Sequence, residues 1–268
     1  MDIKKFVQFE HAGWQSKGEA YSEYFQALTP KTFEAILAEL EQPQDKHFLD
    51  LACGPGYISR LLSAFSSNVT GVDFSAKMVE IAQKLNPSIK FLEGDAENLQ
   101  LPDQTFDYVI INFGVLHFGD PIKCFQECHR VLKPDGKLLF TLWLPATQSI
   151  GMQILYSSIA SYADTSVIPE GPDFFKYANP QTATKDLSDI GFKNISFKDV
   201  DTCWEISNPA DFYNAYVKGG ARLGAMIDRQ SPEVKTKLEA AVLSKLEPLK
   251  VADIYKIPVP SRLWSAQK

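Results

Sequence analysis

The sequence predicts an α/β protein built on a parallel sheet, because strand-like and helix-like segments alternate through its first half. Continuous apolar runs, typical of strands covered on both faces, occupy residues 47–53, 68–74, 89–95, 108–114 and 137–144. Helical patterns lie between them, and this alternation favours right-handed βαβ units. Two further runs, at 194–200 and 260–267, bring the predicted strands to seven.

Helix boundaries are marked by capping residues and prolines. Thr29, followed by Pro30, is predicted to cap a helix that precedes the first strand. Ser75 is predicted to cap the helix after the second strand, and Pro121 to begin the helix after the fourth. Gly191 is predicted to end a short helix. Other helices are expected at 149–160, after Asn208-Pro209 and after Ser231-Pro232.

The segments that do not fit the strand–helix alternation suggest how the domain is organised. We expect a single domain over residues 1–268, with a core formed by 30–145, 181–205 and 258–268. The remaining segments carry apolar helical faces and prolines. We expect these segments, 1–28, 145–180 and 206–257, to be helical insertions that form a lid over the carboxyl end of the sheet.

Composition excludes several classes of protein. The chain has 268 residues, of which 45% are hydrophobic and 22% charged, enough for a sizeable core. A net charge of −6 argues against nucleic-acid binding through phosphate attraction. No apolar run reaches the roughly 20 residues of a membrane helix, and residues 1–14 do not resemble a signal peptide. The four cysteines show no disulfide spacing, so we expect a soluble cytoplasmic protein with reduced thiols.

A glycine-rich turn follows the first predicted strand, in the stretch "LACGPGYISRLLS" (51–63). Gly54 and Gly56 permit a tight turn and a close approach to the backbone, and a helix begins directly afterwards. An ordinary strand-to-helix turn would explain the same residues. The dinucleotide fingerprint G-x-G-x-x-G is incomplete here, because Ser59 stands at the third glycine position, which disfavours a dehydrogenase.

Polar residues stand where the following strands end. Asp73 ends the second predicted strand, Asp95 the third, and "NFGVLH" (112–117) the fourth. Carboxyl ends of adjacent parallel strands meet in one crevice, so Asp73 is expected beside the glycine turn, where its carboxylate can accept both ribose hydroxyls. Capping of the next helix is the alternative for Asp73, although Ser75 is better placed for that role.

Four blocks across residues 45–145 together resemble the class I S-adenosylmethionine-dependent methyltransferases, particularly the small-molecule group that includes quinone-biosynthesis enzymes. The blocks are "FLDLACGPGYIS", "VTGVDFSAKMVEIAQ", "FLEGDAENLQLPDQTFDYVIINFGVLHFGDP" and "ECHRVLKPDGKLLFT". The resemblance implies a doubly wound, mostly parallel seven-stranded sheet whose last strand is antiparallel. It also implies S-adenosyl-L-methionine as the cofactor and a small molecule as the substrate.

The resemblance further implies a set of cofactor contacts. The methionine part would be surrounded by Asp50, Ala52, Gly54 and Gly56. The ribose would bind Asp73, the adenine would lie between Phe74 and Met78 and contact Asp95 and Ala96, and Asn112 would lie near the sulfonium. Ala52 departs from the glycine frequent in the family, and its methyl group is tolerable if this residue is extended.

Methyl transfer needs no catalytic triad, because alignment and desolvation of the reactants supply much of the rate. His117 is the candidate for a base, with packing as the alternative role. Cys124 and Cys128 occupy core positions of a helix, so no metal site is expected there.

Aromatic residues in the predicted lid are candidates for substrate contacts or for lid packing. These candidates are Trp14, Tyr21, Phe174 and Tyr213. Two other functions stay open on the sequence alone: a Rossmann-type nucleotide-dependent oxidoreductase, and an S-adenosylmethionine-binding protein without catalysis. The sequence does not determine the oligomeric state or the methyl-accepting atom.

Overall fold

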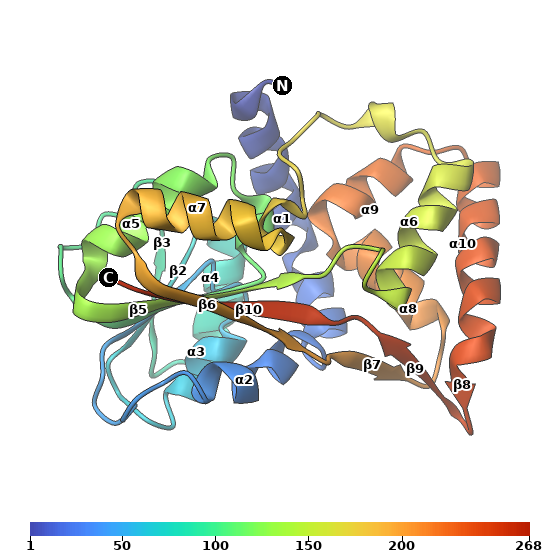
Figure 1. The fold of residues 1–268 in the computed structure, drawn as a ribbon. Coiled ribbons are helices and arrows are strands. Elements are labelled where there is room, and N and C mark those ends of the chain that lie inside the picture. Colours follow the sequence, from blue (N-terminus) through green and yellow to red (C-terminus); the bar gives the residue numbers. More distant parts are fainter. The chain divides into compact units, whose positions relative to one another are not determined.

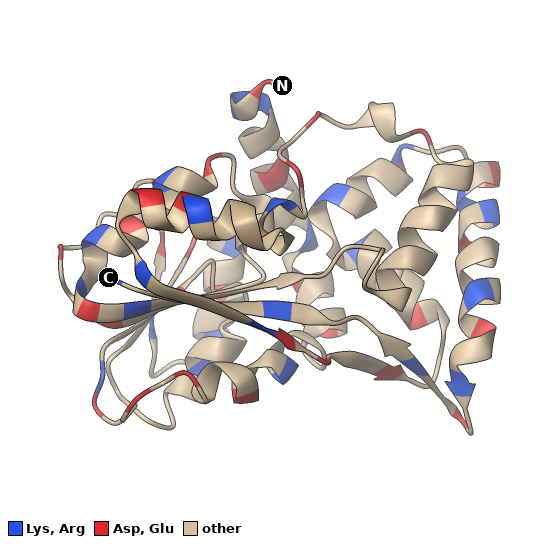
Figure 2. Ribbon diagram, viewed as in Figure 1, with Lys and Arg blue, Asp and Glu red and all other residues tan.

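The computed structural model describes residues 1–268, which divide into two compact units (Figure 1). The sheet unit comprises residues 29–143, 172–200 and 261–268. The helical unit comprises residues 1–28, 144–171 and 201–260. Residues 172–180, which the sequence analysis grouped with the lid, are part of the sheet unit. Lys, Arg, Asp and Glu are interspersed over both units, except on helix α6, which carries none (Figure 2).

The sheet unit contains a seven-stranded sheet in the order β3-β2-β1-β4-β5-β10-β6. Only β10 runs antiparallel, between β5 and β6, which confirms the predicted sheet and its antiparallel last strand. Its strands are β1 (Phe48–Leu51), β2 (Val69–Asp73), β3 (Lys90–Glu93), β4 (Phe106–Asn112), β5 (Leu132–Trp143), β6 (Lys193–Val200) and β10 (Ser261–Gln267).

Helices cover both faces of this sheet. In Figure 1, α5 and α7 lie on one face, and α2 and α3 lie on the other. A buried core joins α2, α3 and α4 to the sheet through residues such as Ile36, Ile58, Ala82 and Ile110. The helices are α2 (Phe33–Leu37), α3 (Tyr57–Leu62), α4 (Ala76–Leu85), α5 (Pro121–Val131) and α7 (Pro180–Ile190), with the short turns η1 (Thr29–Thr32), η2 (Val115–His117) and η4 (Lys176–Ala178).

Three of the predicted helix signals are confirmed. Ser75 Oγ accepts the Met78 backbone N–H at the start of α4. Pro121 begins α5, and Gly191, at φ 115°, ends α7. The predicted role of Thr29 is wrong: a 3₁₀ turn begins there, and the α-helix that follows has only five residues. The carbonyl of Thr29 is engaged by the side chains of Thr32 and Asn112, which favours the tighter turn.

The helical unit holds eleven elements, among them the three helices expected at 149–160, after Asn208-Pro209 and after Ser231-Pro232. The eleven elements are α1 (Ile3–Phe25), α6 (Ile150–Tyr162), η3 (Thr165–Val167), β7 (Cys203–Ile206), α8 (Ala210–Asn214), the π-helical turn η5 (Ala215–Gly219), α9 (Ala221–Asp228), α10 (Pro232–Leu246), η6 (Glu247–Leu249), β8 (Lys250–Val251) and β9 (Ile254–Pro258). The strands form a small antiparallel sheet in the order β7-β9-β8.

Residues 1–28 were expected to be helical, but no helix was placed within them, because the buried side of α1 is not uniformly apolar. Glu10 and Gly18 alternate there with Phe6, Trp14 and Phe25, which weakens the hydrophobic period. The small sheet was missed because its strands are short and one of them ends in proline. Within this unit α1 contacts η5 and α9, and a Cβ atom added at Gly13 would lie 2.7 Å from the Ala221 Cβ atom.

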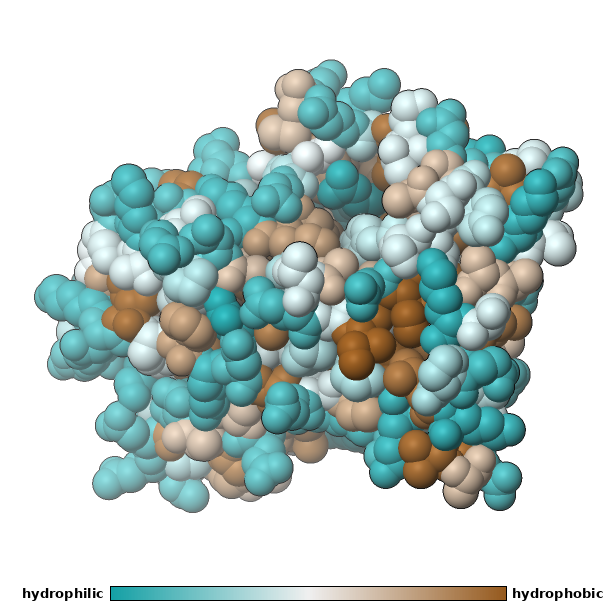
Figure 3. Space-filling view, turned by 45° about the vertical axis from the view of Figure 1, so that its right-hand side comes forward, coloured by the Kyte–Doolittle hydropathy of each residue, from teal (hydrophilic) through white to brown (hydrophobic).

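The surface is largely hydrophilic. The face in Figure 3 shows several separate groups of hydrophobic residues among hydrophilic neighbours. Large exposed apolar side chains include Ile150, Phe197 and Val251. No helix combines the length and the apolar character needed to cross a bilayer. All four cysteines are free thiols.

Candidate cofactor site

The glycine-rich turn between β1 and α3 is anchored to the neighbouring strand β2. The Cys53 N–H donates to the Val72 carbonyl at 3.0 Å, and the Gly54 N–H donates to Asp73 Oδ2 at 2.9 Å. The Gly56 N–H closes the turn by donating to the Cys53 carbonyl at 2.9 Å. Gly54 and Gly56 have φ values of 52° and 77°, so both glycines hold left-handed conformations.

The close approach at Gly56 is made by a side chain of the protein itself. A Cβ atom at Gly56 would lie 2.8 Å from Cζ of Phe91, a buried residue of β3. A Cβ atom at Gly71 in β2 would overlap the same ring. The aromatic ring of Phe91 therefore requires both glycines, and packing accounts for Gly56 without any ligand.

The condition under which the Ala52 methyl group was expected to be tolerable, an extended backbone, is not met. Ala52 has a φ of 55°, a left-handed conformation that costs an L-residue roughly 1–2 kcal/mol. Its methyl group is accommodated because residue 114, at the end of the adjacent strand β4, is a glycine. A Cβ atom at Gly114 would lie only 2.7 Å from the Ala52 Cβ atom.

Asp50 in β1 orders the first turn of α3. Its Oδ2 atom accepts the Ser59 backbone N–H at 2.8 Å and the Ser59 hydroxyl at 2.6 Å. The side chain is 1% exposed, and burial raises the pKa of Asp50 to about 7, despite the two hydrogen bonds from Ser59. The sequence analysis named Asp50 as a ligand contact but did not foresee its bonds to Ser59.

Asp73 at the end of β2 connects the glycine turn to the start of α4. Oδ2 accepts the Gly54 N–H, and Oδ1 accepts the Ser75 N–H at 2.9 Å. Asp73 thus orders the backbone on both sides of the end of β2, and its predicted contact with ribose hydroxyls stays a prediction.

Asp95 and Ala96 lie in the loop that joins β3 to β4 without an intervening helix. Asp95 is exposed, and its Oδ1 atom accepts the Glu97 N–H at 2.8 Å. Two residues of α5 fix this loop: Glu127 accepts the Leu99 N–H at 2.7 Å, and Arg130 donates to the carbonyls of Leu99 and Leu101.

Residues Phe74 and Met78 occupy the start of the α4 segment, as expected for the sides of an adenine site. Met78 is buried at 2% exposure, and Phe74 is half-buried. Their predicted contact with an adenine stays a prediction.

Asn112 is a hydrogen-bonding centre at the end of β4. Its Oδ1 atom accepts the hydroxyls of Thr32 at 2.8 Å and Thr141 at 2.7 Å, and its Nδ2 atom donates to the Thr29 carbonyl at 3.1 Å. The two threonines and Thr29 are partners that sequence reasoning missed, because they are distant in the chain. The predicted place of Asn112 near a sulfonium stays a prediction.

Aromatic side chains gather after β4 and β5. Phe113, at φ 61°, stacks on Trp143 with ring centroids 3.8 Å apart. His117 in η2 packs edge-to-face against Phe174, with centroids 5.7 Å apart. His117 and Phe174 are both half-buried. The structure thus joins a base candidate and a substrate candidate that are 57 residues apart in the sequence.

The other substrate candidates are in the helical unit. On α1, Trp14 donates from Nε1 to Glu10 at 3.2 Å and lies edge-on to Tyr21, with centroids 5.2 Å apart. Tyr213 in α8 is 5% exposed, and burial raises its pKa to about 12. Their predicted substrate contacts stay predictions.

Cys124 and Cys128 lie one turn apart on α5, fully buried, with Sγ atoms 4.0 Å apart. Their position agrees with the core role assigned to them from the sequence.

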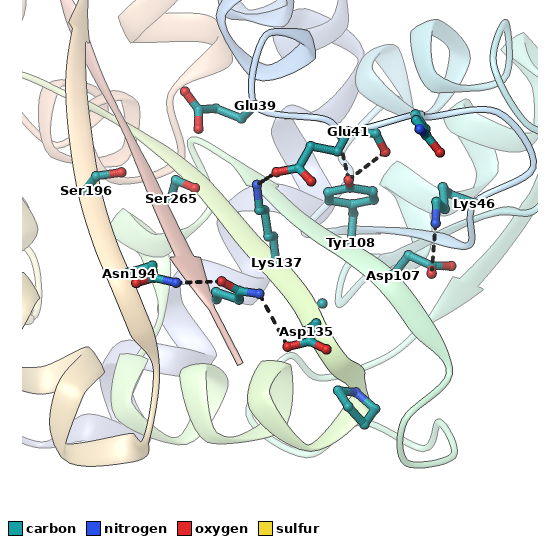
Figure 4. A pocket seen from close by; sticks show the side chains of 14 residues that line it. Glu39, Glu41, Lys46, Asp107, Tyr108, Asp135, Lys137, Asn194, Ser196 and Ser265 are labelled. Atoms are coloured by element: carbon teal, nitrogen blue, oxygen red, sulfur yellow. Dashed lines mark hydrogen bonds and ion pairs between the residues drawn. The ribbon is translucent and has the colours of Figure 1, made fainter.

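A depression of about 890 Å³ lies at the opposite end of the sheet, where β4 and the parallel part of β5 begin (Figure 4). Most of its charged side chains are paired: Lys137 with Glu41 at 2.6 Å, Lys46 with Asp107 at 3.9 Å, and Glu39 with Lys198, outside the depression, at 3.0 Å. The Tyr108 hydroxyl bonds to the backbone of Glu41. The charged and polar side chains of this depression are thus largely paired within the protein, and the depression lies away from the carboxyl ends of the strands.

The residues at the carboxyl ends suit a nucleoside that carries hydrogen-bond donors and a positive charge. Asp73 ends β2, Asp95 follows β3, and the buried Asp50 lies within the adjacent strand β1. Ribose hydroxyls and an adenine amino group donate hydrogen bonds, and a sulfonium is a cation, so acceptor-only carboxylates fit all three. A pyrophosphate would be repelled by the same groups. S-adenosylmethionine therefore fits this site better than a dinucleotide does.

The strand order, its reversal point and the carboxylates beside the glycine turn define a nucleoside-binding protein of Rossmann-like type. A family model described as a methyltransferase domain matches residues 49–140. The demethylmenaquinone methyltransferase of Chlorobaculum parvum is 39% identical over 172 residues, covering 59% of this chain and 70% of that protein. The chain belongs to the class I S-adenosylmethionine-dependent methyltransferases, in the group that includes the demethylmenaquinone methyltransferases.

The similarity varies along the chain. The demethylmenaquinone methyltransferase of Thermotoga maritima is 42% identical over 99 residues, but the match spans only 36% of this chain and 43% of that protein. Among solved structures, phosphoethanolamine N-methyltransferase 2 of Haemonchus contortus has a TM-score of 0.59 at 19% identity, covering 98% of this chain and 60% of that one. At this identity the likeness concerns the fold alone.

Proposed function

We propose that this protein transfers the methyl group of S-adenosylmethionine to a small, quinol-like aromatic molecule. The observation that carries the proposal is the position of Asp73, whose carboxylate holds the Gly54 N–H at 2.9 Å at the reversal point of the sheet. A nucleoside beside this turn meets a carboxylate that is already ordered. The curated relatives are named demethylmenaquinone methyltransferases, which supports a quinol as the acceptor.

The donor side of the proposed site comprises residues 50–56, Asp73 and the Asp95–Leu99 loop. Asp73 accepts the ribose hydroxyls, and Asp95 accepts the adenine amino group beside Ala96. The turn ordered by Asp50 and Ser59 faces the methionine part. When bound, S-adenosylmethionine supplies a methyl group already activated by the sulfonium.

On the acceptor side we place His117, which follows the end of β4, and Phe174, which precedes η4 and packs against His117. Their half-buried rings form an apolar wall against which a flat aromatic acceptor packs. Such a wall aligns the acceptor and excludes water, the two effects on which an in-line displacement depends. Proton removal from a quinol by His117 is the second role that its position allows.

We also propose that the helical unit contributes to acceptor selectivity through Trp14, Tyr21 and Tyr213. The support is the cluster of aromatic rings around Tyr21, which lies edge-on to Trp14 and stacks on Phe25 with centroids 4.8 Å apart. From the net charge of −6 and the free thiols we propose action on a small molecule in the cytoplasm rather than on nucleic acid.

The proposal is tested by incubating the full chain with methyl-labelled S-adenosylmethionine and 1,4-naphthohydroquinone, followed by product detection. Calorimetry with S-adenosylhomocysteine and with NAD measures the donor site separately. We expect a labelled product and binding of the S-adenosyl ligand alone. Binding of NAD without S-adenosylhomocysteine would overturn the cofactor assignment. Donor binding without transfer to any of a panel of quinols and phenols would overturn the acceptor class.

A further inference from the structure

The segment that carries Phe174 is held to the outer strands of the sheet by two buried side chains of β10. The Arg262 Nη1 atom donates to the Ala178 carbonyl at 2.7 Å, and the Trp264 Nε1 atom donates to the Tyr177 carbonyl at 3.0 Å. Arg262 is 5% exposed and Trp264 is fully buried. Residues 177 and 178 are thus fixed through their backbone.

Arg262 is itself locked in place. Its Nε and Nη2 atoms bind the two carboxylate oxygens of Asp199 at 2.6 and 2.9 Å, and its guanidinium lies 4.1 Å from the centroid of the Phe197 ring. The fork geometry of arginine allows the pair with Asp199 and the bond to Ala178 at the same time. A lysine has one nitrogen and cannot make these contacts together.

Backbone hydrogen bonds within residues 173–178 connect the fixed residues 177 and 178 to Phe174. The Lys176 N–H donates to the Asp173 carbonyl and the Ala178 N–H to the Phe175 carbonyl, so residues 173–178 form one continuous turn. The Tyr177 ring packs against Phe125, with centroids 5.2 Å apart. A turn fixed at residues 177 and 178 therefore has little freedom four residues earlier, where Phe174 meets His117.

We infer that Arg262 is a positioning residue for the acceptor, acting through residues 173–178 to hold Phe174 against His117. The inference rests on the proposed function, because it assigns Phe174 and His117 to the acceptor side. Arg262 and Asp199 do not touch the acceptor in this account. Their effect is confined to the acceptor, since the donor contacts belong to other loops.

The chain offers a matched control in Arg130, which binds the Leu99 and Leu101 carbonyls and pairs with Glu127. Arg130 fixes the loop after Asp95 and Ala96, on the donor side. The two arginines thus make the same kind of contact to two different loops. Arg262→Lys is expected to weaken acceptor binding alone, and Arg130→Lys to weaken donor binding alone.

The experiment measures two dissociation constants by calorimetry: that of S-adenosylhomocysteine, and that of 1,4-naphthoquinone with protein saturated by S-adenosylhomocysteine. For Arg262→Lys we expect naphthoquinone to bind roughly tenfold more weakly, with S-adenosylhomocysteine within about twofold of wild type. In a Phe174→Ala background Arg262→Lys should change naphthoquinone affinity less than about twofold, because the side chain that Arg262 positions is absent. An equal effect in both backgrounds would overturn the inference.

A milder variant covers the case in which Arg262→Lys does not fold. Trp264→Phe removes the bond to the Tyr177 carbonyl and part of the buried ring system, and it keeps an aromatic ring facing Phe140, whose centroid is 6.0 Å from that of Trp264. It should show the same acceptor-specific loss at a smaller size. Hydrogen exchange supplies a readout independent of any ligand: the backbone amides of residues 176 and 178 should exchange faster in both variants.

The two proposals fail differently. A wild-type protein that binds S-adenosylhomocysteine but not naphthoquinone contradicts the proposed acceptor class. Hydrogen exchange at residues 176 and 178 then still tests whether Arg262 fixes residues 173–178. Unchanged exchange at residues 176 and 178 in Arg262→Lys contradicts the positioning role itself.

Discussion

The methyl group of Ala52 and the missing side chain of Gly114 are complementary, since a Cβ atom at position 114 would come within 2.7 Å of the Ala52 Cβ atom. The two residues lie just beyond the ends of the adjacent strands β1 and β4. Position 52 is thus an alanine in a left-handed conformation, and the absence of a side chain at Gly114 leaves room for its methyl group.

This relationship predicts non-additive stabilities. Ala52→Gly should raise the free energy of unfolding by about 1 kcal/mol by relieving the left-handed backbone. Gly114→Ala should lower it by about 1–3 kcal/mol, and by less in the Ala52→Gly protein, because contact with Ile111 alone then remains. Urea unfolding of the four proteins measures the coupling. Additivity within about 0.3 kcal/mol would contradict the contact.

The buried carboxyl of Asp50 predicts a pH dependence. Its pKa of about 7 in the folded protein exceeds the ordinary value of 3.8, so the folded state binds the proton more tightly between these values. Its stabilising contribution is complete below about pH 4 and is lost as the pH rises to about 7. Asp50→Asn has no such pH-dependent contribution, because an amide does not ionise in this pH range.

The stability of Asp50→Asn relative to wild type should therefore increase between pH 4.5 and 7.5, by an amount on the order of 3 kcal/mol. Urea unfolding at both pH values measures it, and the other titrating groups are common to both proteins. Parallel stability curves would show that Asp50 titrates near its ordinary pKa.

Substitution of Asp73 should affect both the cofactor and the fold. Asp73→Asn leaves one oxygen for two backbone N–H groups, so we expect the unfolding free energy to fall by about 1–3 kcal/mol. Affinity for S-adenosylhomocysteine should fall roughly ten- to a hundredfold. Asp95→Ala is the control. Because Asp95 is exposed, its substitution should weaken S-adenosylhomocysteine binding with little change in stability. Unchanged affinity in folded Asp73→Asn would show that the ribose site is elsewhere.

His117→Gln separates proton transfer from alignment. We expect kcat to change less than about tenfold, because the half-buried ring packs on Phe174 and alignment dominates. A loss of about a hundredfold or more would assign a base, since general bases contribute on that scale. The kcat–pH profile distinguishes the two: a base would produce an acidic fall in wild type that the variant lacks.

The hydroxyl of Tyr216 is buried in the helical unit without a protein hydrogen-bond partner. Tyr216→Phe should therefore leave the protein equally stable or raise its unfolding free energy by about 1 kcal/mol. Tyr255→Phe is the control in the same unit, because the Tyr255 hydroxyl donates to Glu247 at 3.0 Å and its removal should destabilise. Thermal unfolding compares them. A loss of stability in Tyr216→Phe as large as in Tyr255→Phe would mean that the Tyr216 hydroxyl makes a hydrogen bond in the folded protein.

Much of the fold was predictable because its signals are local. The strand runs, the Ser75 cap, the proline that begins α5 and the Gly191 that ends α7 each depend on a few consecutive residues. The alternation of strands and helices then limits the topology. The carboxylates at the strand ends were predictable for the same reason, since parallel strands bring their carboxyl ends together.

Helix α1 and the small sheet were not predictable from pattern alone. On α1, Glu10 and Gly18 are buried by packing partners that lie far along the chain. Similarly, β8 has two residues and acquires strand geometry only by pairing with β9. Tertiary contacts decided these elements.

The sequence by itself determined the class of protein, because the glycine turn and the acids Asp73 and Asp95 occupy fixed positions relative to their strands. Only the tertiary structure decided what those residues contact. It paired Gly56 with the Phe91 ring, Ala52 with Gly114, and His117 with Phe174. Such contacts join residues from separate strands and loops, and their geometry depends on strand order and side-chain packing, which no local pattern encodes.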